Sequence, residues 1–240
     1  MSETQKSVID AAAQPATGRG VRTRNAVREA AADCFAALGY DAATAAEIAR
    51  RAGVSEATVF SYFGSKRGLL MAVMEDFYAG LLSETQRGAA APADAAERFR
   101  RLVDTWASRV EQDWPLIQVF GQRARYGSDP ELTQAFTELN RRFTRAHLEV
   151  LGELETQGRV AADLPLTLAR DVLFGGLEHT ALGQLAAGRP IALREPARRI
   201  VDLLVRSVPD APPPKGDAGA VRAQLSRIER KLERLLDGPR

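Results

Sequence analysis

Apolar residues recur at three- and four-residue steps along most of the chain from Val21 onward, and almost no segment alternates apolar and polar residues with period two. Such steps are typical of amphipathic helices. The first stretch covers residues 22–38, and glycine at position 39 is a typical helix end. One face of this helix carries Val27, Ala30, Ala31, Cys34, Phe35 and Leu38. The pattern predicts an all-α fold.

The same spacing predicts further helices over 45–52, 56–63, a longer stretch from Ser65, then 94–112, 115–126, 130–157, 163–187 and 194–207. Each break has a local cause, because glycine and proline interrupt helices. They occur at Pro115, residues 127–130, Gly158 and residues 188–190.

The two ends of the chain differ from this pattern. Residues 1–20 lack apolar periodicity and suggest a flexible arm, while residues 209–219 hold four prolines and two glycines, typical of a linker. An amphipathic helix is predicted over about 220–237, with a seam of Val221, Leu225, Ile228, Leu232 and Leu235. This helix could dock on its own core, on the mate in a dimer or on a second dimer, or it could be a frayed tail.

These elements suggest five segments: an arm at 1–20, a helix-turn-helix domain at 21–66, a helical regulatory and dimerisation domain at 67–208, the linker at 209–219 and the C-terminal amphipathic helix at 220–240.

Residues 44–63 carry the signals of a helix-turn-helix. Thr44 and Glu47 form a capping box in which each side chain meets the other residue's amide. Gly53 supplies the positive φ of a tight turn, and Ser55 caps a second short helix, with Val54 and Val59 as its hydrophobic staple. Small and polar residues remain on the outer surface of that helix: Glu56, Ala57, Thr58, Ser61 and Tyr62.

The next helix begins with two cations. Ser65 is its cap, but Lys66 and Arg67 occupy the first turn, where they oppose the helix dipole. Free amides and two cations beside a helix-turn-helix predict a phosphate clamp; otherwise they are solvated charges. The net charge is +3 between Arg19 and Leu70, against +2 for all 240 residues, so the basic excess is local and modest.

The composition and motifs argue against several classes of protein. One cysteine among 240 residues rules out an intrachain disulfide, and no apolar run approaches a membrane span, so we expect a cytoplasmic protein. Two histidines and one cysteine far apart give no metal spacing, and no catalytic or cofactor motif occurs. We therefore expect no enzyme activity, no metal and no cofactor.

Residues 24–70 resemble the tetracycline-repressor (TetR) family. The matching segments are the first helix ending in CFAALGY, TAAEIARRAGVS at 44–55 and TVFSYFGSK at 58–66. The resemblance implies an N-terminal three-helix DNA-binding domain and a larger helical domain that dimerises and binds a small-molecule effector, which would release operator DNA. It also implies backbone contacts by Thr44, Thr58, Tyr62 and Lys66, and places residues 55–57 and Ser61 near bases. Phe60 departs from the tyrosine common in the family and cannot donate to a phosphate.

The regulatory half carries no motif. Helices near 163–187 and 194–207 hold apolar stripes, and Gly175, Gly176 and Gly183 permit close helix approach. We therefore expect these helices to form the dimer surface as well as core; the alternative is ordinary intrachain core. Aromatic and polar residues of the enclosing helices are candidate ligand contacts: Trp106, Phe120, Arg123, Tyr126, Phe143, His147, Phe174 and Glu178.

The leading hypothesis is a dimeric repressor released from double-stranded operator DNA by a small molecule. Activation in place of repression stays open, because the same DNA contact serves both. The alternative is a small-molecule sensor or scaffold that has lost DNA binding and acts through protein partners.

Overall fold

A computed structural model describes residues 18–160 and 164–205 of the chain. Within these residues the regular structure is helical throughout, as predicted. The helices are α1 (Gly18–Ala42), α2 (Ala45–Ala52), α3 (Glu56–Phe63), α4 (Lys66–Ala89), α5 (Ala95–Ala124), α6 (Pro130–Thr156), α7 (Leu166–Ala186) and α8 (Arg194–Leu204). The predicted linker, the C-terminal helix and residues 1–17 of the arm lie outside the described residues.

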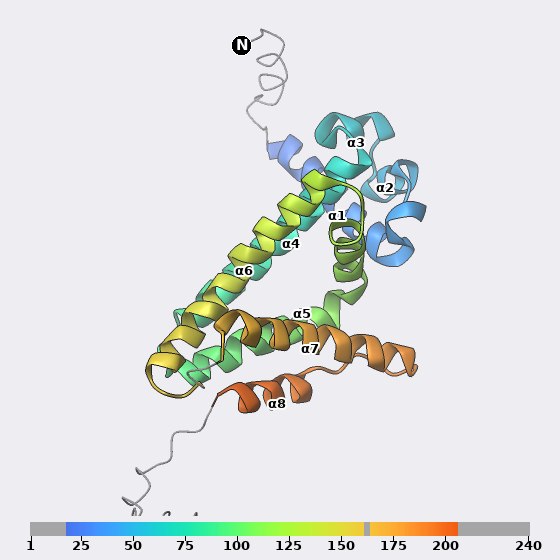
Figure 1. Cartoon of the computed structure of the whole chain (residues 1–240). Coiled ribbons are helices and arrows are strands. Elements are labelled where there is room, and N and C mark those ends of the chain that lie inside the picture. The colour runs from blue at the N-terminus through green and yellow to red at the C-terminus, as the bar shows by residue number, and fades with distance from the viewer. Residues whose placement is uncertain (1–17, 161–163, 206–240) are drawn as a thin grey trace, which may run out of the picture.

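Two groups of helices make up the molecule (Figure 1). The short helices α2 and α3 pack with α1 at one end, and α4 leads from them into the rest. The long helices α4 and α6 lie side by side, and α7 and α8 lie at the end remote from α3. The small unit consists of α1, α2 and α3, and the larger unit of α4 to α8. Helix α1 contacts both α4 and α5, which joins the two units.

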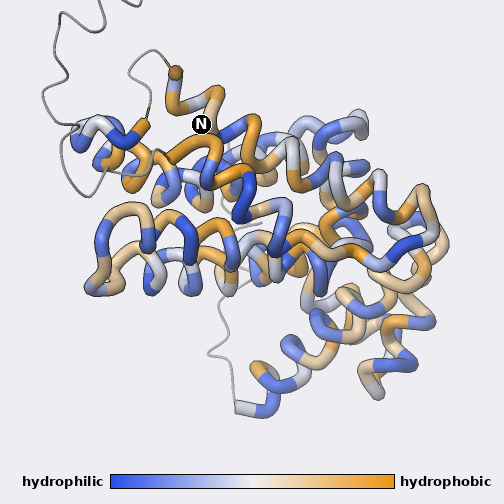
Figure 2. The backbone as a smooth tube through the Cα atoms, turned by 90° about the horizontal axis from the view of Figure 1, so that it is seen from below, coloured by the Kyte–Doolittle hydropathy of each residue, from blue (hydrophilic) through white to orange (hydrophobic). Residues whose placement is uncertain are grey.

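The apolar faces of the helices meet in one buried core. Hydrophobic and hydrophilic stretches alternate along the tube in Figure 2, as expected for amphipathic helices. In the small unit, Phe35 and Ile48 are fully buried; in the large unit, so are Leu70, Phe99 and Leu151. Each such side chain contributes about 1.5–3 kcal/mol relative to an exposed one.

Helix boundaries follow the predicted glycine and proline signals. Gly39 has φ 76°, so the regular part of α1 ends where predicted, although the element continues to Ala42. The predicted break at Pro115 is confirmed as a kink, because α5 (Ala95–Ala124) joins two helical segments across the non-helical Asp113 (φ −115°, ψ 18°). The buried side chains of Trp114 and Leu116 hold the chain on both sides of the proline.

Candidate DNA-binding surface and ligand cavity

The turn between α2 and α3 is fixed by local contacts. The amide of Glu47 donates to Thr44 Oγ1 at 3.2 Å, and the amide of Thr58 donates to Ser55 Oγ at 3.1 Å. Gly53 between the two helices has φ 67°, in the left-handed region that glycine adopts without strain. Val59 on α3 is buried, and together with these contacts it sets the angle between the two helices.

The second half of the predicted capping box does not form. The Glu47 carboxylate accepts hydrogen bonds from Arg50 Nε at 2.8 Å and from Arg51 Nε at 2.7 Å, not from the amide of Thr44. These bonds, that from Arg50 above all, lower the pKa of Glu47 to about 2. Guanidinium groups bind a carboxylate more strongly than a neutral amide does, so the two arginines one turn later take the side chain.

The predicted DNA contacts occupy exposed positions around α3, at the edge of the molecule in Figure 1. Ser55, Glu56, Ala57 and Ser61 are exposed, as is Thr44 at the start of α2. Tyr62 is 38% exposed. The Thr58 side chain is half-buried, with its hydroxyl 2.9 Å from that of Ser55.

Phe60 is 42% exposed, so it does not pack into the core.

Lys66 and Arg67 start α4 as predicted but already have partners. Lys66 Nζ donates to the carbonyl of Asp41 at 3.0 Å and lies 4.6 Å from the centre of the Tyr40 ring. Partial burial at this site lowers the pKa of the Lys66 ammonium.

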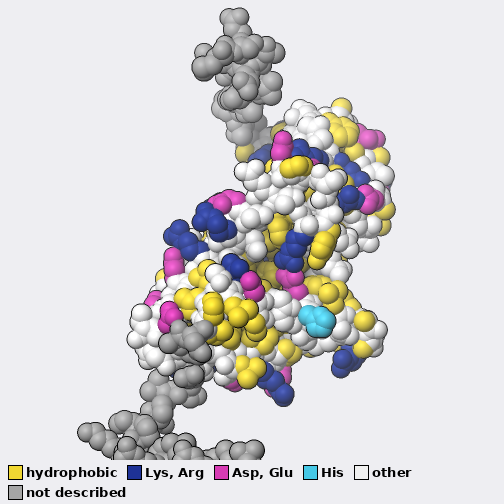
Figure 3. Space-filling model, viewed as in Figure 1, with side chains coloured by type: hydrophobic (Ala, Val, Ile, Leu, Met, Phe, Trp, Pro, Cys, Tyr) yellow, Lys and Arg dark blue, Asp and Glu magenta, His cyan; other side chains and the backbone are white. Residues whose placement is uncertain are grey.

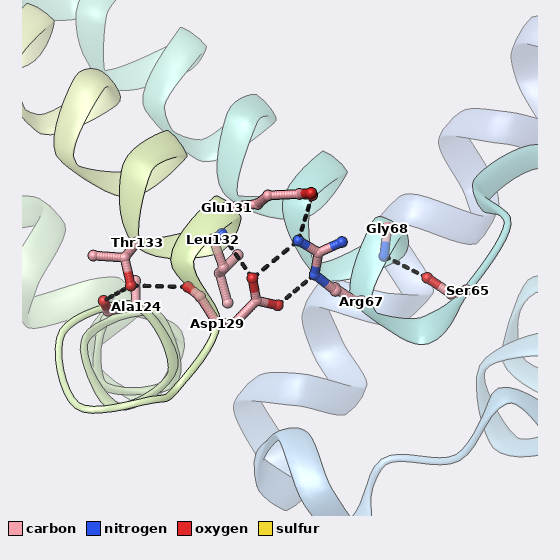
Figure 4. Close-up of polar contacts among 8 residues, drawn as sticks. All are labelled: Ser65, Arg67, Gly68, Ala124, Asp129, Glu131, Leu132 and Thr133. Carbon is pink, nitrogen blue, oxygen red and sulfur yellow. Dashed lines mark hydrogen bonds and ion pairs between the residues drawn. The ribbon is translucent and has the colours of Figure 1, made fainter. Parts of the chain in front are cut away.

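Arg67 points toward the start of α6 (Figure 4). Its guanidinium pairs with both carboxylate oxygens of Asp129, with Nη2 to Oδ1 at 2.9 Å, and its Nη2 also lies 2.6 Å from Glu131. Asp129 in turn caps α6 through the amide of Leu132, and Thr133 Oγ1 donates to the carbonyl of Ala124 at 2.7 Å. This cluster ties α4 to the junction between α5 and α6.

Arg123 makes a second bridge between the two units. Its guanidinium pairs with Asp41 and lies 4.5 Å from the centre of the Tyr40 ring. Tyr40 and Asp41, at the end of α1, are therefore held by Lys66 from α4 and by Arg123 from α5.

The larger unit contains a cavity of about 670 Å³ between α4, α5, α6 and α7. Aromatic side chains make up much of its wall: Phe77, Tyr78, Trp106, Trp114, Phe120, Phe136 and Phe174. Charged and amide side chains also line it, including Gln118, Arg125, Asn140 and Glu178. Arg125 Nη1 lies 2.9 Å from Glu178 Oε2, which joins the end of α5 to α7 at this wall. An apolar cavity with a few polar groups is the usual form of a small-molecule site.

The family model "Bacterial regulatory proteins, tetR family" matches residues 27–73, which include α2, α3 and the start of α4. The N-terminal DNA-binding domain therefore belongs to the TetR family. The protein is a DNA-binding transcriptional regulator, and the match covers the helix-turn-helix geometry described above.

Several similar proteins match this chain over most of their own length. The fatty acid metabolism regulator protein of Bacillus subtilis is 23% identical over 75% of this chain and 92% of its own. The transcriptional repressor Rv1474c of Mycobacterium tuberculosis is 26% identical over 77% and 92%, respectively. The crystal structure of Bacillus subtilis FadR with stearoyl-CoA has the same fold, with a TM-score of 0.67 at 23% identity over 77% of this chain and 99% of that one.

Five of the eight predicted ligand residues line the cavity: Trp106, Phe120, Tyr126, Phe174 and Glu178. Arg123 lies at the domain junction instead. Phe143 and His147 are buried in the core, where the His147 ring packs 5.0 Å from that of Phe143 and 5.1 Å from that of Phe174. Burial lowers the pKa of His147 to about 4.

Sequence reasoning did not select Tyr78 or Arg125. Tyr78 lies on the apolar face of α4 and carries no separate signal. Arg125 immediately follows α5, and only its contact with α7 reveals its position at the cavity.

Helix α7 divides its apolar residues between two faces. Leu173, Leu177 and Ala181 are buried in the chain's own core, whereas other apolar side chains of this helix are exposed: Leu168, Val172, Leu182 and Leu185. Hydrophobic side chains gather over the region of α7 in Figure 3. Of the glycines expected to allow close helix approach, Gly176 faces Ile200 of α8 within the chain, while Gly175 and Gly183 have open space around them.

Residues 18–160 and 164–205 lack the features of two other kinds of protein. None of their helices is long and apolar enough to span a membrane. They also contain no cluster of three or more histidine, cysteine, aspartate or glutamate side chains that could hold a metal ion.

Proposed function

We propose that the protein is a dimeric repressor that a small molecule, bound in the aromatic cavity, releases from operator DNA. The observation that carries this proposal is the pair of bridges from the helix-turn-helix unit to the cavity-bearing unit. Arg67 pairs with Asp129 at the start of α6, and Arg123 pairs with Asp41 at the end of α1. A ligand that moves α5 or α6 would therefore move the recognition helix α3.

Dimerisation follows from how such a helix reads DNA. A single short recognition helix contacts few base pairs, and two-fold dimers read two half-sites about one helical turn apart. The exposed apolar side chains of α7 support this helix as the main contact, with α8 beside it. Exposed apolar patches of this kind mark protein–protein contacts. The two relatives described above also act as regulators, and one is named a repressor.

On the DNA side, we propose that Thr44, Thr58, Tyr62 and Lys66 contact the backbone, and that residues 55–57 and Ser61 face the bases. Their exposure around α3 supports this assignment. Lys66 would exchange its contact with the Asp41 carbonyl for a phosphate, because a charged acceptor binds an ammonium more strongly than a carbonyl does.

The test is binding of the purified protein to duplex DNA taken from beside its own gene, measured over a range of salt concentrations. Affinity should fall linearly with the logarithm of salt concentration, with a slope of about −0.9 for each phosphate contacted. Thr58→Ala and Lys66→Ala should weaken binding, and Arg145→Ala, at an exposed position on α6, should not. Binding that does not respond to salt, or no binding at all, would contradict the proposal.

A further inference from the structure

Among the charged groups of the cavity wall, arginines outnumber carboxylates. Three arginines, at positions 125, 141 and 170, line it against two carboxylates, Asp171 and Glu178. The ionisable wall residues therefore carry a net positive charge. A ligand that complements this wall must offer acceptor atoms, and a negative charge would be favoured.

Two further donors in the wall have no acceptor. Trp106 and Trp114 both line the cavity, and their side chains are 4% and 6% exposed. The indole N–H of each is buried without a hydrogen-bond partner. A buried donor without a partner costs free energy, and tryptophan N–H groups usually find an acceptor when buried. The two indole side chains thus add hydrogen-bond donors, and no acceptors, to the residues of the wall.

Arg125 differs from the other two arginines in the wall. Arg141 pairs with Glu138 and Arg170 with Asp171, each on its own helix. The Arg125 guanidinium instead crosses to Glu178 on α7, at 2.9 and 3.3 Å. It also lies 5.3 Å from the centre of the Phe136 ring. Its position is thus fixed at the cavity wall against an aromatic surface.

This guanidinium retains capacity for a second anion. An arginine side chain has five N–H donors in a planar arrangement, and the Arg125 contacts with Glu178 are made by Nη1 and Nη2. The side chain is 41% exposed, so a ligand can reach it. A carboxylate matches the planar guanidinium and binds it through paired hydrogen bonds.

We propose that the cavity binds an amphipathic anion, with an apolar body among the aromatic rings and a carboxylate on Arg125. This inference rests on the proposed function, since it names the chemical class of the effector. Glu178 is the resident counter-ion of Arg125 and competes with the incoming carboxylate.

The protein provides its own reporter. The chain has two tryptophans, and both line the cavity, so intrinsic fluorescence follows occupancy directly. Decanoate and decan-1-ol have the same number of carbon atoms and differ in charge. We expect decanoate to bind about tenfold more tightly, equivalent to about 1.4 kcal/mol. Equal affinity for the two compounds would overturn the proposal.

Two variants should shift this preference in opposite directions. Arg125→Gln should abolish the preference for decanoate while leaving decan-1-ol binding intact, which also shows that the variant is folded. Glu178→Gln removes the competing carboxylate and should tighten decanoate binding alone. Unchanged preference in Arg125→Gln, or unchanged or weaker decanoate binding in Glu178→Gln, would contradict the assignment. Arg145→Gln, whose partner Glu149 lies on its own helix and which is not part of the cavity wall, is the matched control and should retain the preference.

The fluorescence measurement needs no DNA. Failure of the protein to bind the duplex beside its own gene would therefore count against the repressor proposal alone, and loss of the decanoate preference against the anion site alone.

Discussion

At the N-terminus of α3, the Ser55 hydroxyl accepts the amide of Thr58 and lies 2.9 Å from the Thr58 hydroxyl. Removing a serine cap costs about 1 kcal/mol. We expect Ser55→Ala to lower the free energy of unfolding by about that amount, measured by urea denaturation. Operator affinity should also fall, because the first turn of the recognition helix frays.

Ser61→Ala is the matched control, since Ser61 is exposed on the same helix but does not cap it. This variant should keep the stability of the native protein and lose operator affinity only. A Ser55→Ala protein as stable as the native one would show that the cap is not needed.

Burial of His147 makes the stability of the folded protein depend on pH. Its ring is fully buried, and burial lowers its pKa from 6.5 to about 4. Between these values the unfolded chain binds a proton that the folded protein excludes, so stability is complete above pH 6.5 and falls as the pH drops toward 4. The loss reaches about 3 kcal/mol at the lower end.

Urea denaturation at pH 7, 6, 5 and 4.5 measures how the free energy of unfolding changes with pH. The native protein is compared with His147→Gln, whose side chain does not titrate. The variant should show a shallower fall with acid, even if it is less stable at every pH. Parallel curves for the two proteins would exclude His147 as the source of the pH dependence.

At the scale of elements, the short helices could be predicted from sequence almost to the residue. Their ends depend on groups within a few positions: the Thr44 and Ser55 caps and the positive φ at Gly53. The kink of α5 was predicted for a similarly local reason, because proline disfavours a helical conformation in the residue before it and removes a helical hydrogen bond. The Glu47 side chain was misplaced, since two arginines on its own helix competed for it.

Helix α7 carries the prediction for the dimer. Val172 is 47% exposed on this helix and is not part of the cavity wall. Val172→Glu would place a charge in the proposed contact, where desolvation opposes burial. We expect a monomer by analytical ultracentrifugation at concentrations where the native protein is a dimer.

The control is Leu38→Glu, which adds the same charge at a similarly exposed position (46%) on α1. It should leave the dimer intact. A dimeric Val172→Glu protein would place the contact on another surface.

At the scale of the whole molecule, the sequence predicted the exposed positions around α3 and half of the aromatic cavity wall, but not the ionic connections. Arg67 and Asp129 are 62 residues apart, and Arg125 and Glu178 are 53 residues apart. No local pattern joins such positions, since the pairing depends on how α4, α5, α6 and α7 pack. The sequence therefore suggested that Arg67 was free to bind phosphate, whereas the folded chain uses it between the two units.

This connection suggests how occupancy of the cavity reaches the DNA. Arg125 immediately follows Ala124, whose carbonyl accepts the Thr133 hydroxyl beside the Asp129–Arg67 pair. The double variant Arg67→Gln with Asp129→Asn removes the ion pair, while asparagine can still cap α6. In the native protein, saturating decanoate should weaken operator binding by about tenfold, within the usual range of allosteric coupling. In the double variant, decanoate should still change the tryptophan fluorescence but should weaken operator binding much less.

Arg145→Gln with Glu149→Gln removes an exposed ion pair elsewhere on α6 and should respond to decanoate as the native protein does. Two measurements on the same samples, tryptophan fluorescence and operator binding, separate ligand binding from its transmission. If the junction variant releases DNA as fully as the native protein, the signal does not pass through Arg67. The Arg123–Asp41 bridge, which reaches the same unit through α5 and α1, would then be the route to test next.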